Sequence, residues 1–175
     1  LKTSEPSGKE EKPVGVTKRK IFAVQLHYAR TTHFDFRLEW DGVLLSWAVP
    51  KGPSFNPKDK RLAVRVEEHP LDYADFEGVI PKGEYGGGTV LLWDKGYWTE
   101  TEDFARGLEK GSLKLRLDGK RLKGGWALVR LNDKDKAEDE KENWLLFKEK
   151  DSFAKDTSGL TGRERSVISG LSAKG

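Results

Sequence analysis

The sequence contains no cysteine, and this absence excludes several kinds of site at once. Disulfides, thiolate nucleophiles and sulfur metal ligands all require that residue, so any metal ion must be bound by nitrogen and oxygen atoms. Histidine is also scarce, since only three occur among 175 residues. They all lie between His27 and His69, so a site that uses imidazole must form from this short part of the chain.

Long apolar segments are missing as well. No apolar run approaches the roughly 18 residues that a membrane-spanning helix requires, and residues 1–15 hold no apolar signal core. We therefore expect a cytoplasmic protein without a membrane partner. Methionine is absent and the chain begins at Leu1, so we also expect a piece of a longer protein. The net charge of +3 is mildly basic, which suits a polyanionic partner without requiring one.

Composition divides the chain into three parts. Residues 1–20 are rich in Lys, Glu, Ser, Pro and Gly and have little apolar surface to bury, which predicts a flexible tail. Residues 151–175 are rich in Ser, Gly and Lys, which is typical of a linker. The remaining residues 21–150 form the predicted folded domain.

Within the folded part the apolar residues recur with a period of two, which indicates half-buried strands. Asp41-Gly42 and Asp118-Gly119 predict hairpin turns, because such turns need positive φ. Only the segment EDFARGLEKG reads as a short helix, ended by Gly111. We predict an all-β dominated fold, a compact antiparallel β-barrel of about eight strands with one or two short helices. The strand-like runs are at residues 22–28, 33–40, 43–49, 61–69, 89–98, 113–117, 124–131 and 143–150.

The run HFDFRLEW separates charged from apolar side chains. Alternation along a strand puts His33, Asp35, Arg37 and Glu39 on one face and the aromatic and leucine side chains on the other. We expect the aromatic face to pack outward and the ionic face to point into the barrel. Charges in such an interior must be paired or must bind something.

Three residues from this region form a candidate metal site. His33 and Asp35 aim an imidazole and a carboxylate at one point, and His27 on the preceding strand can supply a third ligand. Two histidines and one carboxylate leave coordination positions open for water and substrate, as a catalytic metal requires. Borderline ions such as Mn²⁺ or Zn²⁺ fit this set better than Mg²⁺, which prefers oxygen ligands.

Cations near this group favour a phosphate substrate. The run RLAVRVEEH is expected to repeat the two-faced pattern, with Arg61, Arg65, Glu67 and His69 opposite Leu62, Val64 and Val66. The forked guanidinium groups of Arg37 and Arg61 match phosphate oxygens, and Lys51 can add a point charge. His69 would interact with the oxygen of the group that leaves the phosphate.

Two other functions remain open from these residues. His33, Asp35 and His69 also match the two-histidine, one-carboxylate set of a non-haem Fe(II) oxygenase. The basic stretch KLRLDGKRLK, residues 114–123, favours a non-catalytic nucleic-acid-binding barrel.

The segments HYARTTHFDFRLEWDGVLLSWAVPKGPS and EEHPLDYADFEGVIPKGEYGGGTV are specific enough to compare with a family. Residues 20–150 closely resemble the 3′-phosphoesterase domain of bacterial DNA ligase D. The resemblance implies a compact antiparallel barrel that uses Mn²⁺, with Zn²⁺ or Co²⁺ as alternatives. It also implies removal of a 3′-terminal ribonucleoside to leave a 3′-phosphate, followed by removal of that phosphate to leave a 3′-hydroxyl.

The resemblance assigns roles and partners too. It implies that His27, His33 and Asp35 bind the metal. The residues that it places around the scissile phosphate are Arg37, Lys51, Arg61 and His69, completed by Glu67 and Tyr73. The implied substrates are the 3′ ends of DNA or DNA/RNA primer-templates at the nucleoid. The implied partners in end joining are ligase and polymerase modules, fused or separate, and Ku.

Overall fold

A computed structural model of the chain describes residues 19–81, 87–132, 141–160, 165–167 and 169–170. Residues 1–18 of the predicted tail lie outside these ranges. Strands dominate the described part, together with two short helices. The elements are β1 (Lys20–Tyr28), β2 (Thr32–Trp40), β3 (Val43–Val49), β4 (Arg61–His69), η1 (Leu71–Asp75), β5 (Gly78–Ile80), β6 (Gly88–Glu100), α1 (Phe104–Lys110), β7 (Ser112–Gly119), β8 (Lys123–Arg130) and β9 (Asn143–Lys148).

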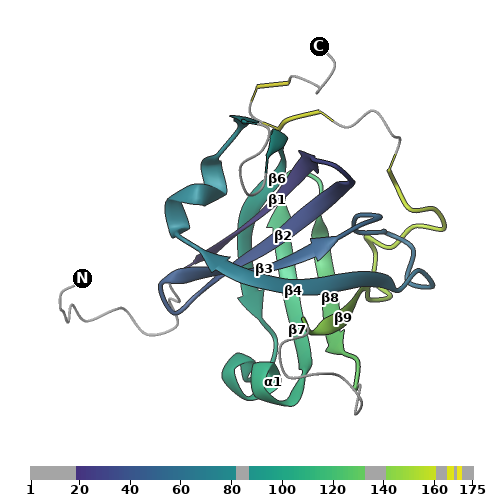
Figure 1. The fold of residues 1–175 in the computed structure, drawn as a ribbon. Helices are drawn as coiled ribbons and strands as arrows, with labels where there is room; N and C mark the ends of the chain where they lie inside the picture. The colour runs from purple at the N-terminus through teal and green to yellow at the C-terminus, as the bar shows by residue number, and fades with distance from the viewer. Residues whose placement is uncertain (1–18, 82–86, 133–140, 161–164, 168, 171–175) are drawn as a thin grey trace.

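The strands form a closed barrel (Figure 1). Their order is β1-β2-β3-β4-β9-β8-β7-β6, and pairing of β1 with β6 closes the ring of eight strands. Neighbouring strands are antiparallel, and the three-residue β5 adds to the free part of the β6 edge. The predicted antiparallel barrel with one or two short helices is therefore confirmed.

The barrel interior is apolar and rich in aromatic rings. Trp47, Trp126 and Trp144 are fully buried and pack with Phe36 and leucines from almost every strand. The prediction that the ionic face of β2 points into the barrel is wrong, because its aromatic face fills that space. Burying large aromatic surfaces is favourable, whereas an ionic interior would have to offset a heavy desolvation cost. The charged residues of β2 consequently lie on the outer wall.

The predicted two-faced pattern of β4 is also wrong. Ala63 is buried in the core, whereas Leu62 is 42% exposed and Val64 and Val66 are only partly buried. The register with β3 then shifts between the pairs Ser46–Val66 and Leu44–His69. This irregularity inserts one residue and breaks simple alternation.

The turn at Asp41-Gly42 is confirmed. Asp41 has φ of 53° and Gly42 has φ of 85°, so both adopt the left-handed region that a tight hairpin needs. This turn sets the register of β2 against β3, in which Phe36 lies opposite Trp47.

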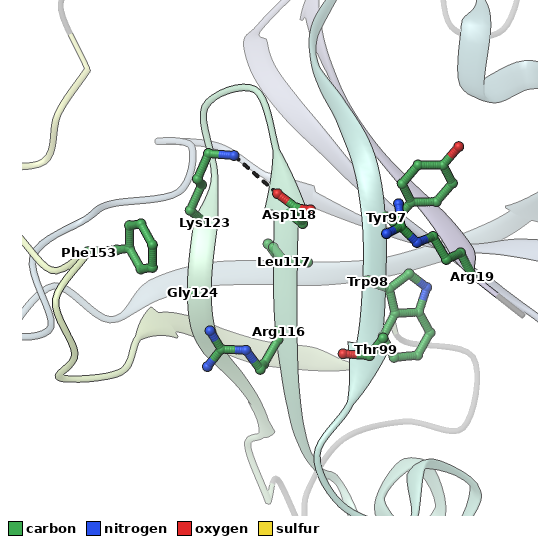
Figure 2. A pocket seen from close by; sticks show the side chains of 10 residues that line it. All are labelled: Arg19, Tyr97, Trp98, Thr99, Arg116, Leu117, Asp118, Lys123, Gly124 and Phe153. Atoms are coloured by element: carbon green, nitrogen blue, oxygen red, sulfur yellow. Dashed lines mark hydrogen bonds and ion pairs between the residues drawn. The ribbon is translucent and has the colours of Figure 1, made fainter. Parts of the chain in front are cut away.

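The turn predicted at Asp118-Gly119 is wrong, although the hairpin exists. Both residues extend β7, and Asp118 pairs with Lys123 of β8 at 3.1 Å (Figure 2). The turn falls at residues 120–122, where the fully buried carboxylate of Asp94 accepts three backbone hydrogen bonds. The donors are the amides of Lys120, Arg121 and Leu122, at 2.8, 3.0 and 2.7 Å. A residue far away in sequence thus places the turn.

The predicted helix is confirmed as α1. Its N-cap Asp103 accepts the amide hydrogen of Arg106, and Gly111 ends it with φ of 84°. The second helix, η1, packs on the outer wall through Ala74, next to Ala23 and Leu44. Neither helix in the described residues is long or apolar enough to cross a membrane.

The described residues beyond position 150 contact the barrel. The amide of Phe55 donates to the carbonyl oxygen of Ser158, and that of Lys155 donates to the carbonyl oxygen of Phe55. Val167 donates to Leu92 of β6. The proposed linker at 151–175 stays a prediction, as does the domain boundary at 150.

Asp94→Ala should lower the free energy of unfolding by on the order of 3 kcal/mol, because it leaves one buried and two partly buried backbone amides of the turn without an acceptor. Urea unfolding measures this loss. The matched control is Asp118→Ala, which removes an acid that is 71% exposed and should cost less than about 1 kcal/mol. Equal losses in the two variants would contradict the role given to Asp94.

Candidate active site

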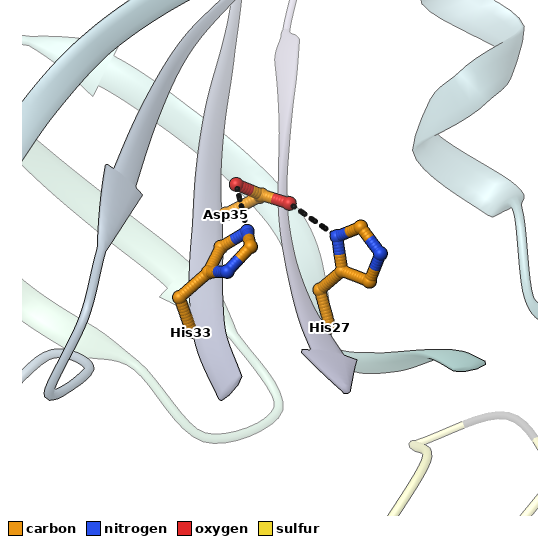
Figure 3. Close-up of side chains that lie close together, drawn as sticks. All are labelled: His27, His33 and Asp35. Atoms are coloured by element: carbon orange, nitrogen blue, oxygen red, sulfur yellow. Dashed lines mark ion pairs between the residues drawn. The ribbon is translucent and has the colours of Figure 1, made fainter. Parts of the chain in front are cut away.

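The predicted metal ligands converge on the outer wall of the barrel. Pairing of β1 with β2 sets His27 opposite His33, and Asp35 follows two residues later on the same face. The Asp35 carboxylate lies between the two rings (Figure 3). Its Oδ1 is 3.3 Å from Nε2 of His33, and its Oδ2 is 3.7 Å from Nδ1 of His27. One ligand atom from each residue lies within 4.8 Å of the others.

Electrostatics keep this carboxylate ionised. Burial alone would raise the pKa of Asp35, but contacts with His27 and His33 and the charge of Arg37 hold that pKa well below its usual range. The hydrogen bond with Asp35 in turn raises the pKa of His33, although burial works against it. A bound cation would take the place of the His33 proton, since metal and proton compete for the same nitrogen.

The donor set fits a divalent ion. Two imidazole nitrogens and one carboxylate oxygen can bind the ion while leaving room for water and substrate. In the described part of the chain, no other cluster of three or more such side chains comes this close together. The identity of the ion, Mn²⁺ or alternatively Zn²⁺ or Co²⁺, stays a prediction.

Arg37 connects this metal-ligand group to the next part of the site. Its side chain is almost fully buried, with 4% exposed. Its Nε donates to Oε1 of Gln25 at 2.6 Å, and its Nη1 donates to Oγ of Ser46 at 2.8 Å. Nη1 also lies 3.0 Å from Nδ1 of His69, and Nη2 lies 3.5 Å from Oδ2 of Asp35. The guanidinium is thus fixed between the carboxylate and the third histidine.

Sequence reasoning missed Gln25 and Ser46, which hold Arg37. Gln25 also donates to the carbonyl oxygens of Tyr73 and Phe76, and so ties η1 to the barrel wall. Both residues had a signal in the sequence. Gln25 shares the strand face of His27, and Ser46 is the one polar residue in the apolar run VLLSWAV.

His69 lies at the end of β4 and accepts from Arg37. A guanidinium can only donate, so Nδ1 of His69 must accept and Nε2 must carry the hydrogen. Nδ1 also lies 3.1 Å from the carbonyl oxygen of Glu67, a contact that would require the opposite tautomer. We assign the Nε2–H form, because the guanidinium of Arg37 can only donate to Nδ1 and because burial and the charge of Arg37 lower the pKa of His69 and so favour the neutral ring.

Tyr73 of η1 covers this arrangement. Its ring centroid lies 5.0 Å from Cζ of Arg37 and 4.8 Å from the ring of His69, and Phe76 stacks behind it. Burial raises the pKa of Tyr73, so its hydroxyl stays protonated at neutral pH. The ring packs over the nearly buried Arg37, while the hydroxyl keeps its capacity to donate.

The other three predicted residues lie beside this group rather than within it. Glu67 is exposed on β4, two residues before His69. Arg61 donates to the carbonyl oxygens of Lys51 and Gly52 at 2.8 and 3.4 Å, and its Nη2 lies 3.7 Å from Asp59. Lys51 and Arg61 line a pocket of about 600 Å³ together with Lys58 and Lys60. This pocket adjoins the His33 end of β2, because Phe34 pairs with Val49 of β3.

Comparison with known proteins identifies the family of the chain. The family described as "DNA Ligase D 3'-phosphoesterase domain" matches residues 25–130, a range that includes every predicted site residue. The chain belongs to this family. The matched range runs from β1 to β8 and so covers most of the barrel.

Three relatives show the extent of the similarity. The multifunctional non-homologous end joining protein LigD of Pseudomonas aeruginosa is 51% identical over 170 residues, which cover 95% of this chain and 20% of that protein. LigD of Mycobacterium tuberculosis is 50% identical over 111 residues, 63% of this chain and 14% of that protein. LigD of Mycolicibacterium smegmatis is 41% identical over 157 residues, 86% of this chain and 19% of that protein. The chain thus spans a fifth or less of each relative.

His33→Ala should weaken Mn²⁺ binding by at least about tenfold, because it removes one of three ligands and the partner of Asp35. Titration calorimetry or the electron spin resonance signal of free Mn²⁺ measures this loss. His69→Ala is the matched control, since His69 contacts Arg37 rather than the ligand group, and it should keep Mn²⁺ binding. Loss of the ion in the control but not in His33→Ala would overturn the assignment.

The metal-free protein should hold His69 neutral at a pH where a free histidine is already protonated. The folded state binds this proton less tightly than the unfolded chain, so the contribution of His69 to stability is lost as pH falls from the ordinary value of 6.5 through the lowered pKa. NMR titration of the ring should show that Arg37→Gln raises the pKa of His69. Arg65→Gln should leave it unchanged, and a pKa that is insensitive to Arg37 would refute the contact.

Proposed function

We propose that this chain heals 3′ ends of nucleic acid in DNA end joining, as a metal-dependent phosphodiesterase and phosphomonoesterase. The observation that carries the proposal is the ligand group of His27, His33 and Asp35 set directly against a buried arginine. The family supports hydrolysis of phosphate esters, and the end-joining relatives support DNA ends as the place of action. In the first step water cleaves the last phosphodiester, releasing a ribonucleoside and leaving a 3′-phosphate. In the second step water cleaves that monoester, leaving a 3′-hydroxyl and inorganic phosphate.

The ligand residues hold the ion that the reaction needs. A bound Mn²⁺ ion supplies Lewis-acid polarisation of a phosphate oxygen and a more acidic bound water. Arg37 adds a fixed positive charge beside the ligand group, where negative charge develops on the phosphate. Lys51 and Arg61 extend the positive potential along the adjoining pocket, which suits the phosphate next to the one cleaved.

In this proposal His69 and Tyr73 interact with the oxygen of the leaving group. In its assigned tautomer His69 directs Nδ1 to Arg37 and leaves Nε2–H as a donor. The protonated hydroxyl of Tyr73 is a second donor, and exposed Glu67 modulates the charge of His69. Because the leaving group is a ribonucleoside oxygen in one step and the 3′-oxygen in the other, these donors need not matter equally in both.

The oxygenase alternative fits the geometry less well. It requires His69 to join His33 and Asp35 around one iron ion. Arg37 stands between Asp35 and His69 and donates to the nitrogen that would face such an ion.

The test is a primer-template that ends in one ribonucleotide, incubated with Mn²⁺, with products resolved by length and by end group. A shortened strand with a 3′-phosphate should appear first, and a 3′-hydroxyl strand should follow. A 5′-phosphate on the same duplex should remain. His33→Ala should slow both steps by at least about 100-fold.

Tyr73→Phe separates the two steps. The phenyl ring keeps the contacts with Arg37 and His69, so the substitution removes only the hydroxyl. Removing one hydrogen bond in one step should change the ratio of the two rates by about tenfold. Removal of 5′-phosphates as fast as 3′-phosphates by the unaltered chain would refute the proposed function.

The proposal extends to partners and place. Because the relatives are multifunctional end-joining proteins several times longer than this chain, we infer that it acts with ligase and polymerase modules and with Ku. Its DNA substrates place it at the nucleoid in the cytoplasm.

A further inference from the structure

A second charged surface lies on the outer wall at β6, β7 and the start of β8, and it reaches the beginning of β1. The site occupies the outer wall at β1, β2, β3 and the end of β4, whereas β7 lies between β6 and β8 across the ring. We call this surface the β7 face. It consists of Arg19, Tyr97, Arg116, Asp118, Lys120 and Lys123.

Strict alternation along β7 creates this face. Residues 112–119 alternate between exposed and buried, so Leu113, Leu115 and Leu117 enter the core. Arg116 and Asp118 consequently point outward. On β6, Tyr97 is 42% exposed while its neighbour Trp98 is buried.

The β7 face has an excess of positive charge. Two adjoining pockets of about 310 and 540 Å³ share Arg19 and Lys123, and the β7 face contributes four cations and one carboxylate to their lining; the further cation that lines them, Lys95, is paired with Asp75. The carboxylate, Asp118, is paired with Lys123. No carboxylate in the described parts of the chain lies within ion-pair distance of Arg116 or Lys120.

Exposed aromatic rings border the same pocket. Cζ of Arg19 lies 4.9 Å from the ring centroid of Tyr97, at one side of the smaller pocket. Phe153, 42% exposed, lines the other side next to Gly124. Figure 2 shows Arg116, Asp118 and Lys123 between these two rings. Cations combined with accessible rings are what barrels use to hold single strands, through phosphate contacts and base stacking.

We propose that the β7 face binds a single strand of nucleic acid, with Arg116 and Lys120 contacting phosphates and Tyr97 stacking on a base. An acidic protein surface could pair with the cations, but it would offer no base to stack on the two exposed rings. The inference rests on the proposed function: the β7 face binds a part of the strand that is distant from the 3′ end, while the candidate active site acts on that end.

The test measures binding apart from catalysis. Fluorescence anisotropy measures the binding of a labelled oligo(dT) to His33→Ala protein in EDTA. The oligonucleotide has about 16 nucleotides, which is the upper site size of an OB-fold barrel. In this background Arg116→Gln with Lys120→Gln should weaken binding by about tenfold. The dependence of log K on log salt should become less steep by about 1.4, because each phosphate that the protein no longer neutralises lowers the slope by about 0.7.

The matched control removes the same charge elsewhere. Arg106→Gln with Lys110→Gln neutralises two exposed cations of α1, and binding should change by less than about twofold. Tyr97→Ala should weaken binding by about tenfold, whereas Tyr97→Phe, which keeps the ring, should not.

Two results would overturn the proposal. One is equal weakening in the β7-face and α1 double variants, which would show general attraction to a basic protein. The other is competition by poly-glutamate as effective as by unlabelled oligonucleotide, which would indicate an acidic protein partner.

Measuring hydrolysis of 3′ ends beside oligonucleotide binding shows whether the β7-face proposal or the proposed function is refuted. If the protein without substitutions shows no hydrolysis but its binding still depends on Arg116, Lys120 and Tyr97, the β7 face stands and the proposed function fails. If the protein hydrolyses 3′ ends but substitution of these residues does not change oligonucleotide binding, only the proposal for the β7 face is refuted.

Discussion

Closure of the sheet between β1 and β6 is the constraint on which the candidate site depends. In a closed barrel, a slip of one residue would turn the aromatic side chains of β2 out of the interior and bring its charges in. The packing of Phe36 against Trp47 therefore fixes more than the core, since it also fixes His27 opposite His33 on the outside. The positions of the three candidate metal ligands are precise because the apolar interior behind them allows one register.

Arg37 then makes the site a single electrostatic unit. A nearly buried guanidinium carries a large desolvation cost, and contacts with Gln25, Ser46, His69 and Asp35 offset it. Each partner holds Arg37 in place and is also changed by it. At Asp35 the contacts with His27 and His33 lower the pKa and the charge of Arg37 adds to them, whereas at His69 burial lowers the pKa and Arg37 again adds to the effect. Substitutions in this network should not be additive.

Local patterns predicted the strands, the Asp41-Gly42 turn, α1 and the approach of His27 to His33 and Asp35. These patterns failed where a residue distant in the sequence determines which face of a strand is buried or where a turn falls. Alternation defines two faces of β2 but not which one is inside, because that depends on the volume left by the other strands. The turn after β7 was misplaced because Asp94, on another strand, supplies the acceptor that positions it. The register shift in β4 has no local signal, and so the faces of its residues were misassigned.

The strands β2 and β7 carry the same alternation of charged and apolar residues yet end in different environments. The outward charges of β2 lie near η1, the segment that Gln25 ties to the barrel wall, so Asp35 and Arg37 are buried and bonded to each other. No described element covers β7 in this way, and Arg116 remains exposed. Because η1 covers the charged face of β2, that face is desolvated, and fixed charges interact more strongly there with a reacting group than they would in water. The uncovered face stays hydrated and suits reversible, salt-sensitive contact with a long polyanion.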